Sequence, residues 1–412
     1  MAHRKRETCR ICGGKDFRMF LSLGPSPPAN SFLRSPDEFA SERCFPLDVY
    51  RCETCSLVQL LDVIDPEILF RNYLYVTGTS DTMNAHNLEY ARALVHELSL
   101  SAEDLVVEIA SNDGSLLRCF GKYSVRTLGV EPATNLARVA VENGIKTENV
   151  FFNSLSAQKI RITHGAASAV VANNVLAHVD DPRDFLIGCK LLLKEGGSLI
   201  AEVPSLYDLI TGVEYDTIYH EHLCYFSLTN LMHLCETTGF SIRKAEWKPV
   251  HGGTLRITVK DQRLYPNHSA DVLNATGKKR EECLIGHEWC ERFAAKVQSQ
   301  RNALRQLLYK LKGEGKAIAA YGAPAKGNTL LNYCGLGTDA ISFVVDKNPL
   351  KVGLYTPGTH IPVLPVNALL ERKPDYVLIL AWNFAEEIMR QQEAYKRQGG
   401  LFIIPVPEPR IL

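Results

Sequence analysis

Leu105-Val-Val-Glu-Ile-Ala-Ser-Asn-Asp-Gly-Ser115 joins an apolar run to a polar turn in this 412-residue chain. A helical pattern begins at Leu116, and a second apolar run, Arg126–Val130, ends in the acid Glu131. This order predicts strand, tight turn, helix and strand, which is the first half of a doubly wound parallel sheet. The sequence therefore predicts an α/β fold with a Rossmann-like domain at this point.

The turn and the acid after the second strand indicate the kind of cofactor. Glu131 is suited to the two ribose hydroxyls of an adenosine group. The turn contains Gly114 but lacks the GxGxxG pattern that lets a pyrophosphate approach the backbone. An adenosine cofactor without a pyrophosphate fits better, and S-adenosylmethionine is the common one. A Rossmann-like domain for another nucleotide is the alternative.

The expected cofactor contacts lie on the turn and at the ends of the predicted strands: Glu108, Ala110, Ser111, Asn112, Gly114, Glu131, Asn153 and Asn173. One of them departs from the usual pattern. Ala110 stands where methyltransferases of this architecture usually carry glycine, and its methyl group could crowd the carboxylate end of the cofactor.

The segments that follow continue the alternation of strands and helices. Ser168–Ala172 is predicted as a strand that ends at Asn173, and Asp184–Leu193 as a helix. The turn Lys194–Gly197 then leads into a predicted strand, Ser198–Val203. This order is typical of class I S-adenosylmethionine methyltransferases, whose cofactor lies along the strand ends.

Two Cys-x-x-Cys pairs near the N-terminus predict a metal site. Thiolates from Cys9, Cys12, Cys52 and Cys55 suit a closed, tetrahedral zinc site with a structural role. A disulfide pair is disfavoured because we find no signal peptide, and because the other cysteines are scattered singly through apolar segments. This cysteine usage predicts a reducing cytoplasm.

Composition argues against several classes of protein. Hydrophobic residues make up 46% and charged residues 22% of the chain, as in ordinary soluble proteins of two or three domains. No apolar run is long enough to span a bilayer, so a membrane protein is not expected. The formal net charge is zero and the basic run His3–Arg6 is short, so no nucleic-acid partner is expected. The oligomeric state stays open, and a monomer is compatible with the sequence.

The pattern divides the chain into five regions: a zinc-binding module (1–65), a helical connector with a polar and aromatic loop (66–100), the S-adenosylmethionine domain (101–260), a helical linker (261–312) and a second Rossmann-like α/β domain (313–412). In the last region Lys316–Tyr321 and Ile341–Asp346 are predicted strands, and Gly322–Asn328 is a predicted turn before the helix Thr329–Tyr333. Lys326 in this turn is a candidate anion site, because a helix N-terminus favours phosphate. The alternative is a turn that only connects two elements.

Tyr219-His-Glu-His222 is the densest group of titratable side chains in the sequence. Imidazole can take a proton near pH 7, a carboxylate can orient it, and a phenol can donate to a developing oxyanion. In an extended segment Tyr219 and Glu221 would point to one face and His220 and His222 to the other. Acid–base catalysis and a partly buried polar turn both remain open from these residues alone.

Taken in order, the motifs resemble the sugar C-methyltransferase family, whose enzymes methylate C3 of a nucleotide-linked 4-keto-deoxysugar. The resemblance runs nearly end to end and rests on the two Cys-x-x-Cys pairs, Tyr73-Leu-Tyr75, VVEIASNDG (106–114), NNVLAHV (173–179), YDTIYHEHLCYFS (215–227), HGGTLR (251–256), YGAPAKGNTLLNY (321–333) and WNFAEEI (382–388). It implies a zinc-binding lobe, a central S-adenosylmethionine domain and a Rossmann-like C-terminal lobe.

The resemblance also implies roles for individual residues. His222 is the general base that removes the C3 proton, and Tyr219 and His178 orient the ketone or stabilise its enolate. Glu221 and Tyr75 lie near the sugar, and His220 is expected to be structural. Further substrate contacts are expected from Thr79, Ser80, Arg256 and Lys326. Two other functions stay open: an enzyme that enolises a keto-sugar without methylation, such as a C3 epimerase, and a zinc-ribbon binding protein or RNA methyltransferase.

Overall fold

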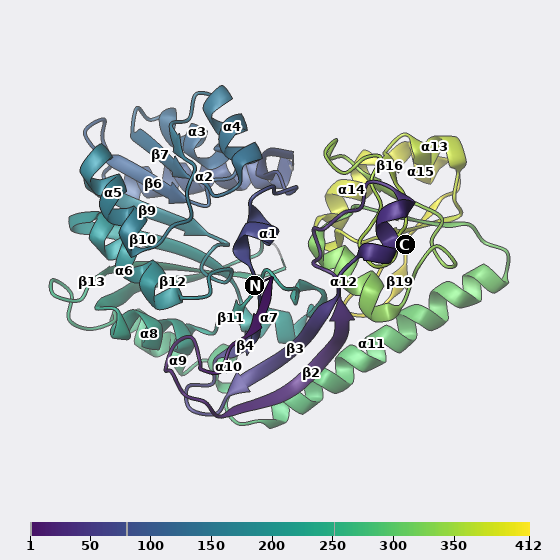
Figure 1. Ribbon diagram of the computed structural model, residues 1–412, viewed down its shortest axis with the longest axis horizontal. Helices are drawn as coiled ribbons and strands as arrows, with labels where there is room; N and C mark the ends of the chain where they lie inside the picture. The colour runs from purple at the N-terminus through teal and green to yellow at the C-terminus, as the bar shows by residue number, and fades with distance from the viewer. Residues whose placement is uncertain (1, 80, 251) are drawn as a thin grey trace. The chain divides into compact units, whose positions relative to one another are not determined.

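The computed structural model describes residues 2–79, 81–250 and 252–412, and its ribbon forms two compact units (Figure 1). Neither unit is a continuous stretch of chain. The first comprises Met1–Arg18, Arg51–Tyr207 and Leu223–Ile285, and the second comprises Met19–Tyr50, Asp208–His222 and Gly286–Leu412. The division of the chain into five regions remains a proposal.

The first unit is built on a seven-stranded sheet with the order β12-β13-β10-β9-β6-β7-β8. The strands are β6 (Leu105–Ile109), β7 (Arg126–Val130), β8 (Thr147–Glu148), β9 (Ala167–Asn173), β10 (Leu193–Pro204), β12 (Phe240–Lys248) and β13 (Thr254–Asp261). From β10 to β8 every pair is parallel, and β13 is antiparallel to both of its neighbours. The chain turns back at β6 and β9, which is where open α/β sheets bind ligands at their carboxyl ends. The predicted Rossmann-like methyltransferase sheet is confirmed.

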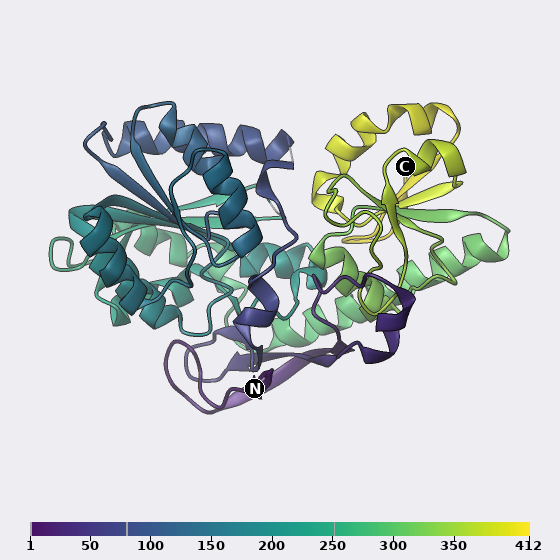
Figure 2. The same ribbon diagram turned by 45° about the horizontal axis from the view of Figure 1, so that its top comes forward.

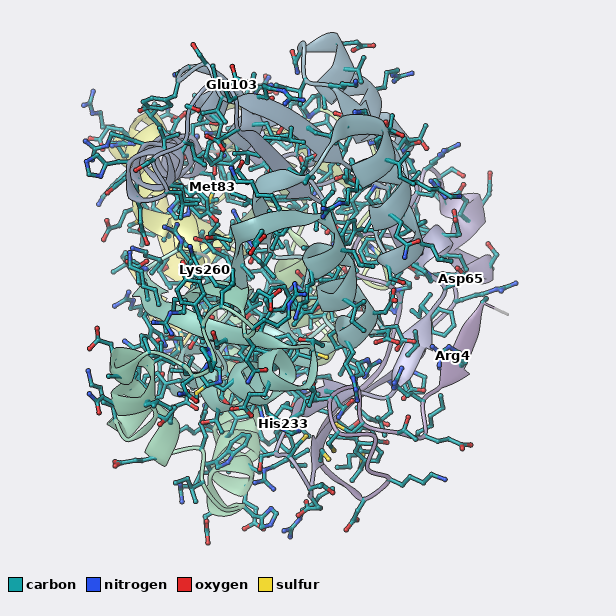
Figure 3. The ribbon with its side chains drawn as sticks, turned by 90° about the vertical axis from the view of Figure 1, so that its left-hand side faces the viewer. Arg4, Asp65, Met83, Glu103, His233 and Lys260 are labelled. Carbon is teal, nitrogen blue, oxygen red and sulfur yellow. The ribbon has the colours of Figure 1, made fainter. Side chains whose placement is uncertain are left out.

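Helices cover both faces of this sheet (Figure 2), because alternate residues of each strand point to opposite sides. Val107 of β6 packs with Phe185 of one helical layer, and Val106 packs with Leu117 of the other. The helices of this unit are α1 (Pro66–Phe70), α2 (Asp81–Glu97), α3 (Ser115–Gly121), α4 (Thr134–Glu142), α5 (Ser154–His164), α6 (Pro182–Leu192), α8 (Leu228–Thr237), α9 (Ala270–Thr276) and α10 (Lys279–Glu282). Figure 3 shows this unit from another side, and the labelled charged residues Glu103 and Arg4 lie far apart on the face that it presents.

The cysteine-rich segment is part of the first unit rather than a separate body. β1 (His3–Lys5) pairs with β5 (Asp62–Ile64), and β4 (Val58–Leu60) pairs with β11 (Cys224–Tyr225). Buried Ile11 belongs to the same hydrophobic core as the central sheet. The longer strands β2 (Phe17–Ser26) and β3 (Phe45–Cys52) each carry the chain from one unit into the other.

The second unit contains a six-stranded sheet with the order β16-β15-β14-β17-β18-β19. Its strands are β14 (Ile318–Tyr321), β15 (Val344–Asp346), β16 (Val363–Pro365), β17 (Tyr376–Ile379), β18 (Leu401–Ile404) and β19 (Arg410–Ile411), and β19 alone among these six is antiparallel. The accompanying helices are α11 (Glu288–Gly313), α12 (Ala325–Cys334), α13 (Ala368–Arg372), α14 (Ala385–Gln391) and α15 (Glu393–Arg397). Numbered along the chain, the strands follow the order 3-2-1-4-5-6 of dinucleotide-binding folds, which confirms the predicted second Rossmann-like domain.

The first helix of this second domain starts earlier than the sequence predicts. α12 begins at Ala325 rather than Thr329, so Lys326 and Gly327 lie in its first turn and not in a loop. A Cβ atom on Gly327 would meet the Cβ of Leu380 at 2.7 Å. The glycine therefore serves close packing of the helix on the sheet. In the described part of the chain, no helix has both the length and the apolar character to cross a membrane.

Candidate active site and zinc site

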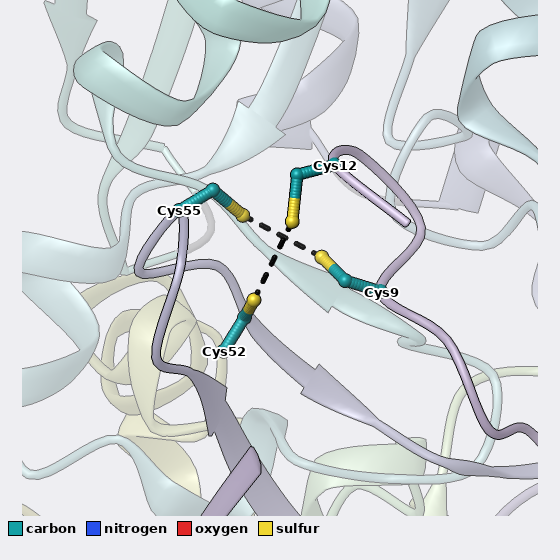
Figure 4. A group of neighbouring side chains, drawn as sticks. All are labelled: Cys9, Cys12, Cys52 and Cys55. Atoms are coloured by element: carbon teal, nitrogen blue, oxygen red, sulfur yellow. Dashed lines mark hydrogen bonds between the residues drawn. The ribbon is translucent and has the colours of Figure 1, made fainter. Parts of the chain in front are cut away.

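The four predicted metal ligands come together in the first unit. The sulfur atoms of Cys9, Cys12, Cys52 and Cys55 all lie within 4.8 Å of one another (Figure 4). Cys9 Sγ is 3.5 Å from Cys55 Sγ, and Cys12 Sγ is 3.6 Å from Cys52 Sγ. Zinc–sulfur bonds of about 2.3 Å in a tetrahedron give sulfur–sulfur edges of roughly 3.8 Å. The four sulfur positions therefore fit a zinc ion with all of its positions filled by protein.

Neighbouring groups are arranged for thiolates rather than for neutral thiols. Gln59 Nε2 donates to Cys9 Sγ at 3.2 Å, and the Gly14 N–H donates to Cys12 Sγ at 3.4 Å. A zinc ion with four thiolates has a net charge of −2, and Arg10, between the first two cysteines in sequence, supplies a buried positive charge. The donor set and this charge both fit zinc.

Arg10 also joins the zinc site to the loop that carries His178. Its Nη1 donates to Gln59 Oε1 at 3.1 Å and to the Leu60 carbonyl at 2.5 Å. Its Nη2 lies 3.1 Å from a carboxylate oxygen of Asp180, two residues after His178. Arg10 thereby connects the segment that carries Cys9 and Cys12 to the loop at the end of β9.

The turn after β6 holds its residues in a conformation that glycine would adopt more readily. Ala110 has φ of 57° and Asn112 has φ of 53°, both in the left-handed region. This conformation costs a residue with a Cβ about 1 kcal/mol or more. The backbone geometry explains why methyltransferases of this architecture usually carry glycine where this chain has Ala110.

Glu131 anchors the same turn from the end of β7. One carboxylate oxygen accepts the Asn112 N–H at 2.8 Å, and the other accepts the Ala133 N–H at 2.8 Å. Burial raises the pKa of Glu131 to about 7 against these two hydrogen bonds. Each carboxylate oxygen has a second lone pair, so the group can still accept from a ribose hydroxyl.

The aromatic loop before α2 is fastened to the turn by the Asn112 side chain. Asn112 Nδ2 donates to the Tyr75 carbonyl at 3.0 Å, and Asn112 Oδ1 accepts the Thr77 N–H at 3.0 Å. Burial and the nearby Asp113 carboxylate raise the pKa of Tyr75 to about 12, so its hydroxyl keeps its proton at neutral pH. Two expected substrate contacts, Ser80 and the Thr79 side chain, fall outside the described residues.

A buried polar network lies behind the carboxyl end of β9. Tyr90 donates its hydroxyl to Asn173 Oδ1 at 3.2 Å, and the Arg256 guanidinium lies 3.9 Å from the Tyr90 ring centroid. Arg256 is paired with Glu202, with its Nε 2.7 Å and its Nη2 2.5 Å from Glu202 Oε1. Arg256 was expected to contact substrate, and the structure engages two of its nitrogens in this ion pair.

His178 and Asn153 occupy different kinds of position. Burial lowers the pKa of His178 to about 4, so its ring is neutral at pH 7. Asn153, whose contact with the cofactor stays a prediction, caps α5, because its Oδ1 accepts the Ser156 N–H at 2.8 Å and Ser156 Oγ accepts the Asn153 N–H at 2.9 Å. This reciprocal pair is a capping box.

Tyr219–His222 forms a turn in the second unit, not an extended segment. The His222 N–H donates to the Tyr219 carbonyl at 2.8 Å, and Tyr219 Oη lies 2.8 Å from His222 Nε2. His222 Nδ1 lies 2.8 Å from the Thr217 carbonyl, which can only accept. When the ring is neutral, its proton is therefore on Nδ1, and Nε2 accepts from Tyr219. The alternation expected for an extended segment is wrong here, because three-residue spacing in a turn puts Tyr219 and His222 on the same side.

The two residues between them face other partners. Glu221 Oε1 accepts a hydrogen bond of 2.7 Å from Asn30 Nδ2. His220 Nε2 lies 3.3 Å from the Phe45 carbonyl and 3.2 Å from the Pro46 carbonyl, as a structural histidine would. The buried Lys351 ammonium lies in the field of Glu221 and Asp346, whose charges oppose the lowering of the Lys351 pKa by burial.

Lys326 lies among groups that the sequence did not assign. Its Nζ is 4.5 Å from the centroid of the Trp382 ring, and Trp382 Nε1 donates to Asp216 Oδ2 at 2.6 Å. The Lys326 ammonium opposes the rise that burial causes in the pKa of both Glu214 and Asp216. Asp216 and Trp382 lie in two of the motifs on which the family resemblance rests. Their place in these motifs was the only sign in the sequence that they matter, and it indicated no role for either residue.

Three family profiles match successive parts of the chain. The "Putative zinc binding domain" matches residues 9–70, the "Methyltransferase domain" matches 83–245, and the "C-methyltransferase C-terminal domain" matches 249–407. The C-methyltransferase NovU of Streptomyces niveus is 35% identical to this chain over 406 residues, which are 98% of this chain and 97% of that protein. The chain belongs to the C-methyltransferase family. It is an S-adenosylmethionine-dependent C-methyltransferase with a structural zinc site.

Solved methyltransferase structures resemble part of this C-methyltransferase. The magnesium protoporphyrin IX methyltransferase ChlM from Synechocystis PCC 6803, with bound S-adenosylmethionine, is 12% identical and covers 43% of this chain and 81% of its own, with a TM-score of 0.33. A methyltransferase from Clostridium acetobutylicum ATCC 824 is 14% identical and covers 44% of this chain and 93% of its own, with a TM-score of 0.36.

The turn after β6, residues 110–114, and the acids around it fit S-adenosylmethionine. Glu108 Oε2 and Ser111 Oγ are buried and have no hydrogen-bond partner among the described residues. Burial and the nearby charges of Asp113 and Glu131 raise the pKa of Glu108 well above its usual range. A cofactor with a sulfonium and an ammonium group suits a site lined by three acids, and unpaired buried oxygens suit a ligand that can donate hydrogen bonds.

Proposed function

We propose that this C-methyltransferase adds a methyl group to C3 of a nucleotide-linked 4-keto-deoxysugar in deoxysugar biosynthesis. Hydrogens beside a ketone are acidic, because the carbanion left behind is delocalised onto oxygen. The observation that carries the proposal is the His222 ring, whose Nδ1–H is held by Thr217 and whose Nε2 lone pair faces the Tyr219 hydroxyl. A neutral histidine fixed in this tautomer is suited to remove such a proton.

The proposed reaction begins with a proton transfer from C3 of the sugar to His222. His222 Nε2 takes the C3 proton, and the electron pair of the broken C–H bond passes to the ketone oxygen as an enolate. Tyr219 turns its hydroxyl from Nε2 to this oxygen, and neutral His178 can donate to it as well. The enolate would leave C3 ready to take up a methyl group from a cofactor held by the 110–114 turn and Glu131, and His222 later releases its proton to solvent. S-Adenosylmethionine, when bound, supplies the electrophilic methyl group.

The other expected site residues divide into two groups. Glu221 and Tyr75 are proposed to grip the sugar, and the Asn30 and Asn112 side chains hold their segments in place. Arg256 pairs with Glu202, and the charge of Lys326 acts on Asp216. We therefore propose that both side chains have a structural role and do not primarily bind phosphate.

Mass spectrometry of a reaction in deuterated water tests the proposal. The mixture contains the enzyme, S-adenosylmethionine and a thymidine-diphospho-4-keto-2,6-dideoxyhexose. A sugar product heavier by one methyl group in place of hydrogen supports C-methylation. Deuterium uptake at C3 without methylation would support enolisation by the base but contradict transfer to this sugar. A sugar that gains neither methyl nor deuterium would refute the substrate class.

A further inference from the structure

We infer that Asp216 and Trp382 are positioning residues that fix the tautomer of His222 through the Thr217 carbonyl. The inference rests on the proposed function of His222 as the base. It concerns a group of side chains within the second unit that take no direct part in the proposed reaction. The group consists of Asp216, Trp382, Lys326 and Glu214.

The contacts form a continuous chain. Trp382 Nε1 donates to Asp216 Oδ2 at 2.6 Å, and Asp216 is fully buried. Asp216 directly precedes Thr217 in the 3₁₀ turn η3 (Tyr215–Thr217), so holding its carboxylate holds the next peptide group. The Thr217 carbonyl at the end of this turn accepts from His222 Nδ1 at 2.8 Å.

The turn itself is tied at both ends. The Thr217 N–H and Oγ1 donate to the Glu214 carbonyl at 3.0 Å and 2.7 Å, and the Ile218 N–H donates to the Tyr215 carbonyl at 3.0 Å. The Tyr215 hydroxyl donates to Gln300 Oε1 at 2.6 Å. These bonds restrict the movement of the Thr217 carbonyl, which accepts from His222, as long as Asp216 stays bonded to Trp382.

A cation and an N–H donor act against the effect of burial on the acids of this cluster. Burial raises the pKa of Glu214 to about 9, so this side chain is protonated at neutral pH. Burial also raises the pKa of Asp216, and the Lys326 ammonium and the Trp382 N–H oppose that change. Lys326 Nζ lies 4.5 Å from the centroid of the Trp382 ring, whose N–H donates to Asp216.

The tautomer matters because only one nitrogen can act as the base. With the proton on Nδ1, Nε2 carries the electron pair that can take the C3 proton once the Tyr219 hydroxyl turns away from it. If the Thr217 carbonyl is displaced, the other tautomer becomes populated and Nε2 carries a proton that blocks its action. Groups that orient a functional histidine through its second nitrogen are commonly worth 10- to 100-fold in activity, as metal sites illustrate.

The test compares Trp382→Phe with Trp289→Phe. Phenylalanine at 382 removes the N–H and keeps an aromatic ring under Lys326. Trp289, buried in α11 with its ring 5.5 Å from that of Phe20, provides the same substitution away from the η3 turn. Asp216→Asn is a second variant, in case the first fails to fold, and S-adenosylmethionine affinity reports folding.

The principal readout is the ¹⁵N NMR spectrum of His222 in the resting enzyme, assigned by its loss in His222→Ala. Trp382→Phe is expected to shift the two ring nitrogens toward the Nε2–H tautomer and to lower kcat by about 10- to 100-fold, with KM changed less than about twofold. Trp289→Phe is expected to change neither. An unchanged His222 spectrum and kcat in both Trp382→Phe and Asp216→Asn would overturn the inference.

This design separates two kinds of failure. Full turnover in His222→Ala would remove the proposed base, whereas the tautomer shift would still be measured without any reaction. Loss of turnover in His222→Ala together with an unshifted spectrum in Trp382→Phe would leave the base in place and reject the positioning role.

Discussion

Arg10→Met is expected to destabilise the zinc-binding part of the first unit by about 2 kcal/mol. The side chain is fully buried, and its Nη1 hydrogen bonds to the Leu60 carbonyl and to Gln59 Oε1 would be lost. Gln59 Oε1 keeps the Arg10 N–H at 3.3 Å, so the Leu60 carbonyl is the acceptor left without a partner. One unsatisfied buried acceptor costs about 1–3 kcal/mol, and the apolar methionine offsets part of the lost packing.

The same carboxylate offers a matched control. Asp180 also pairs with Arg4, whose side chain is 53% exposed, and with Arg6 Nη1 at 3.3 Å. Because exposed ion pairs contribute about 0–1 kcal/mol, Arg4→Met is expected to change stability by less than 1 kcal/mol. Both variants lose one arginine opposite Asp180, and only the first removes a buried guanidinium that is bonded to Gln59, the residue that donates to Cys9 Sγ.

The assay combines urea unfolding with the rate of zinc release to a coloured chelator. Arg10→Met is expected to lower the unfolding midpoint and to release zinc faster than Arg4→Met. If the two variants lost the same free energy and released zinc at the same rate, the buried hydrogen bonds and charge compensation described for Arg10 would be refuted.

Four further outcomes are expected. His222→Ala should abolish turnover while calorimetry finds S-adenosylmethionine binding unchanged, and residual activity near that of the parent would contradict its role as base. Cys52→Ser should lose zinc by elemental analysis and weaken the N-terminal fold, so a fully stable, metal-free variant would argue against a structural metal. Affinity for S-adenosylmethionine should fall as pH drops below about 7, because protonated Glu131 accepts hydrogen bonds less well than its carboxylate. The Glu131→Gln variant should lack this pH dependence. An affinity of the parent enzyme that does not change with pH would be inconsistent with a ribose contact. Ala110→Gly should change stability by less than about 1 kcal/mol, since relief of the left-handed strain offsets the entropy of an added glycine, and it should bind the cofactor at least as tightly; weaker binding would show that the methyl group does not crowd it.

Local sequence patterns determined the architecture and the zinc ligands. The apolar run, turn and helix from Leu105 to Gly121 form as predicted, because strand period, turn residues and helix start act over a few neighbouring residues. The same holds for Cys9 and Cys12, whose spacing needs only one turn of chain. Asn153 shows the limit of this reasoning, since a polar residue before a helix serves equally as a cap or as a ligand contact.

Tertiary structure decided which side chains meet. The sequence does not reveal that Trp382 donates to Asp216 across 166 positions, or that Arg10 lies against Asp180. It also left the Tyr219–His222 segment open between an extended strand and a turn, and the tautomer of His222 follows from the turn. Contacts between residues far apart in the chain depend on how complete sheets and helices pack, and no period or local propensity of a segment encodes them.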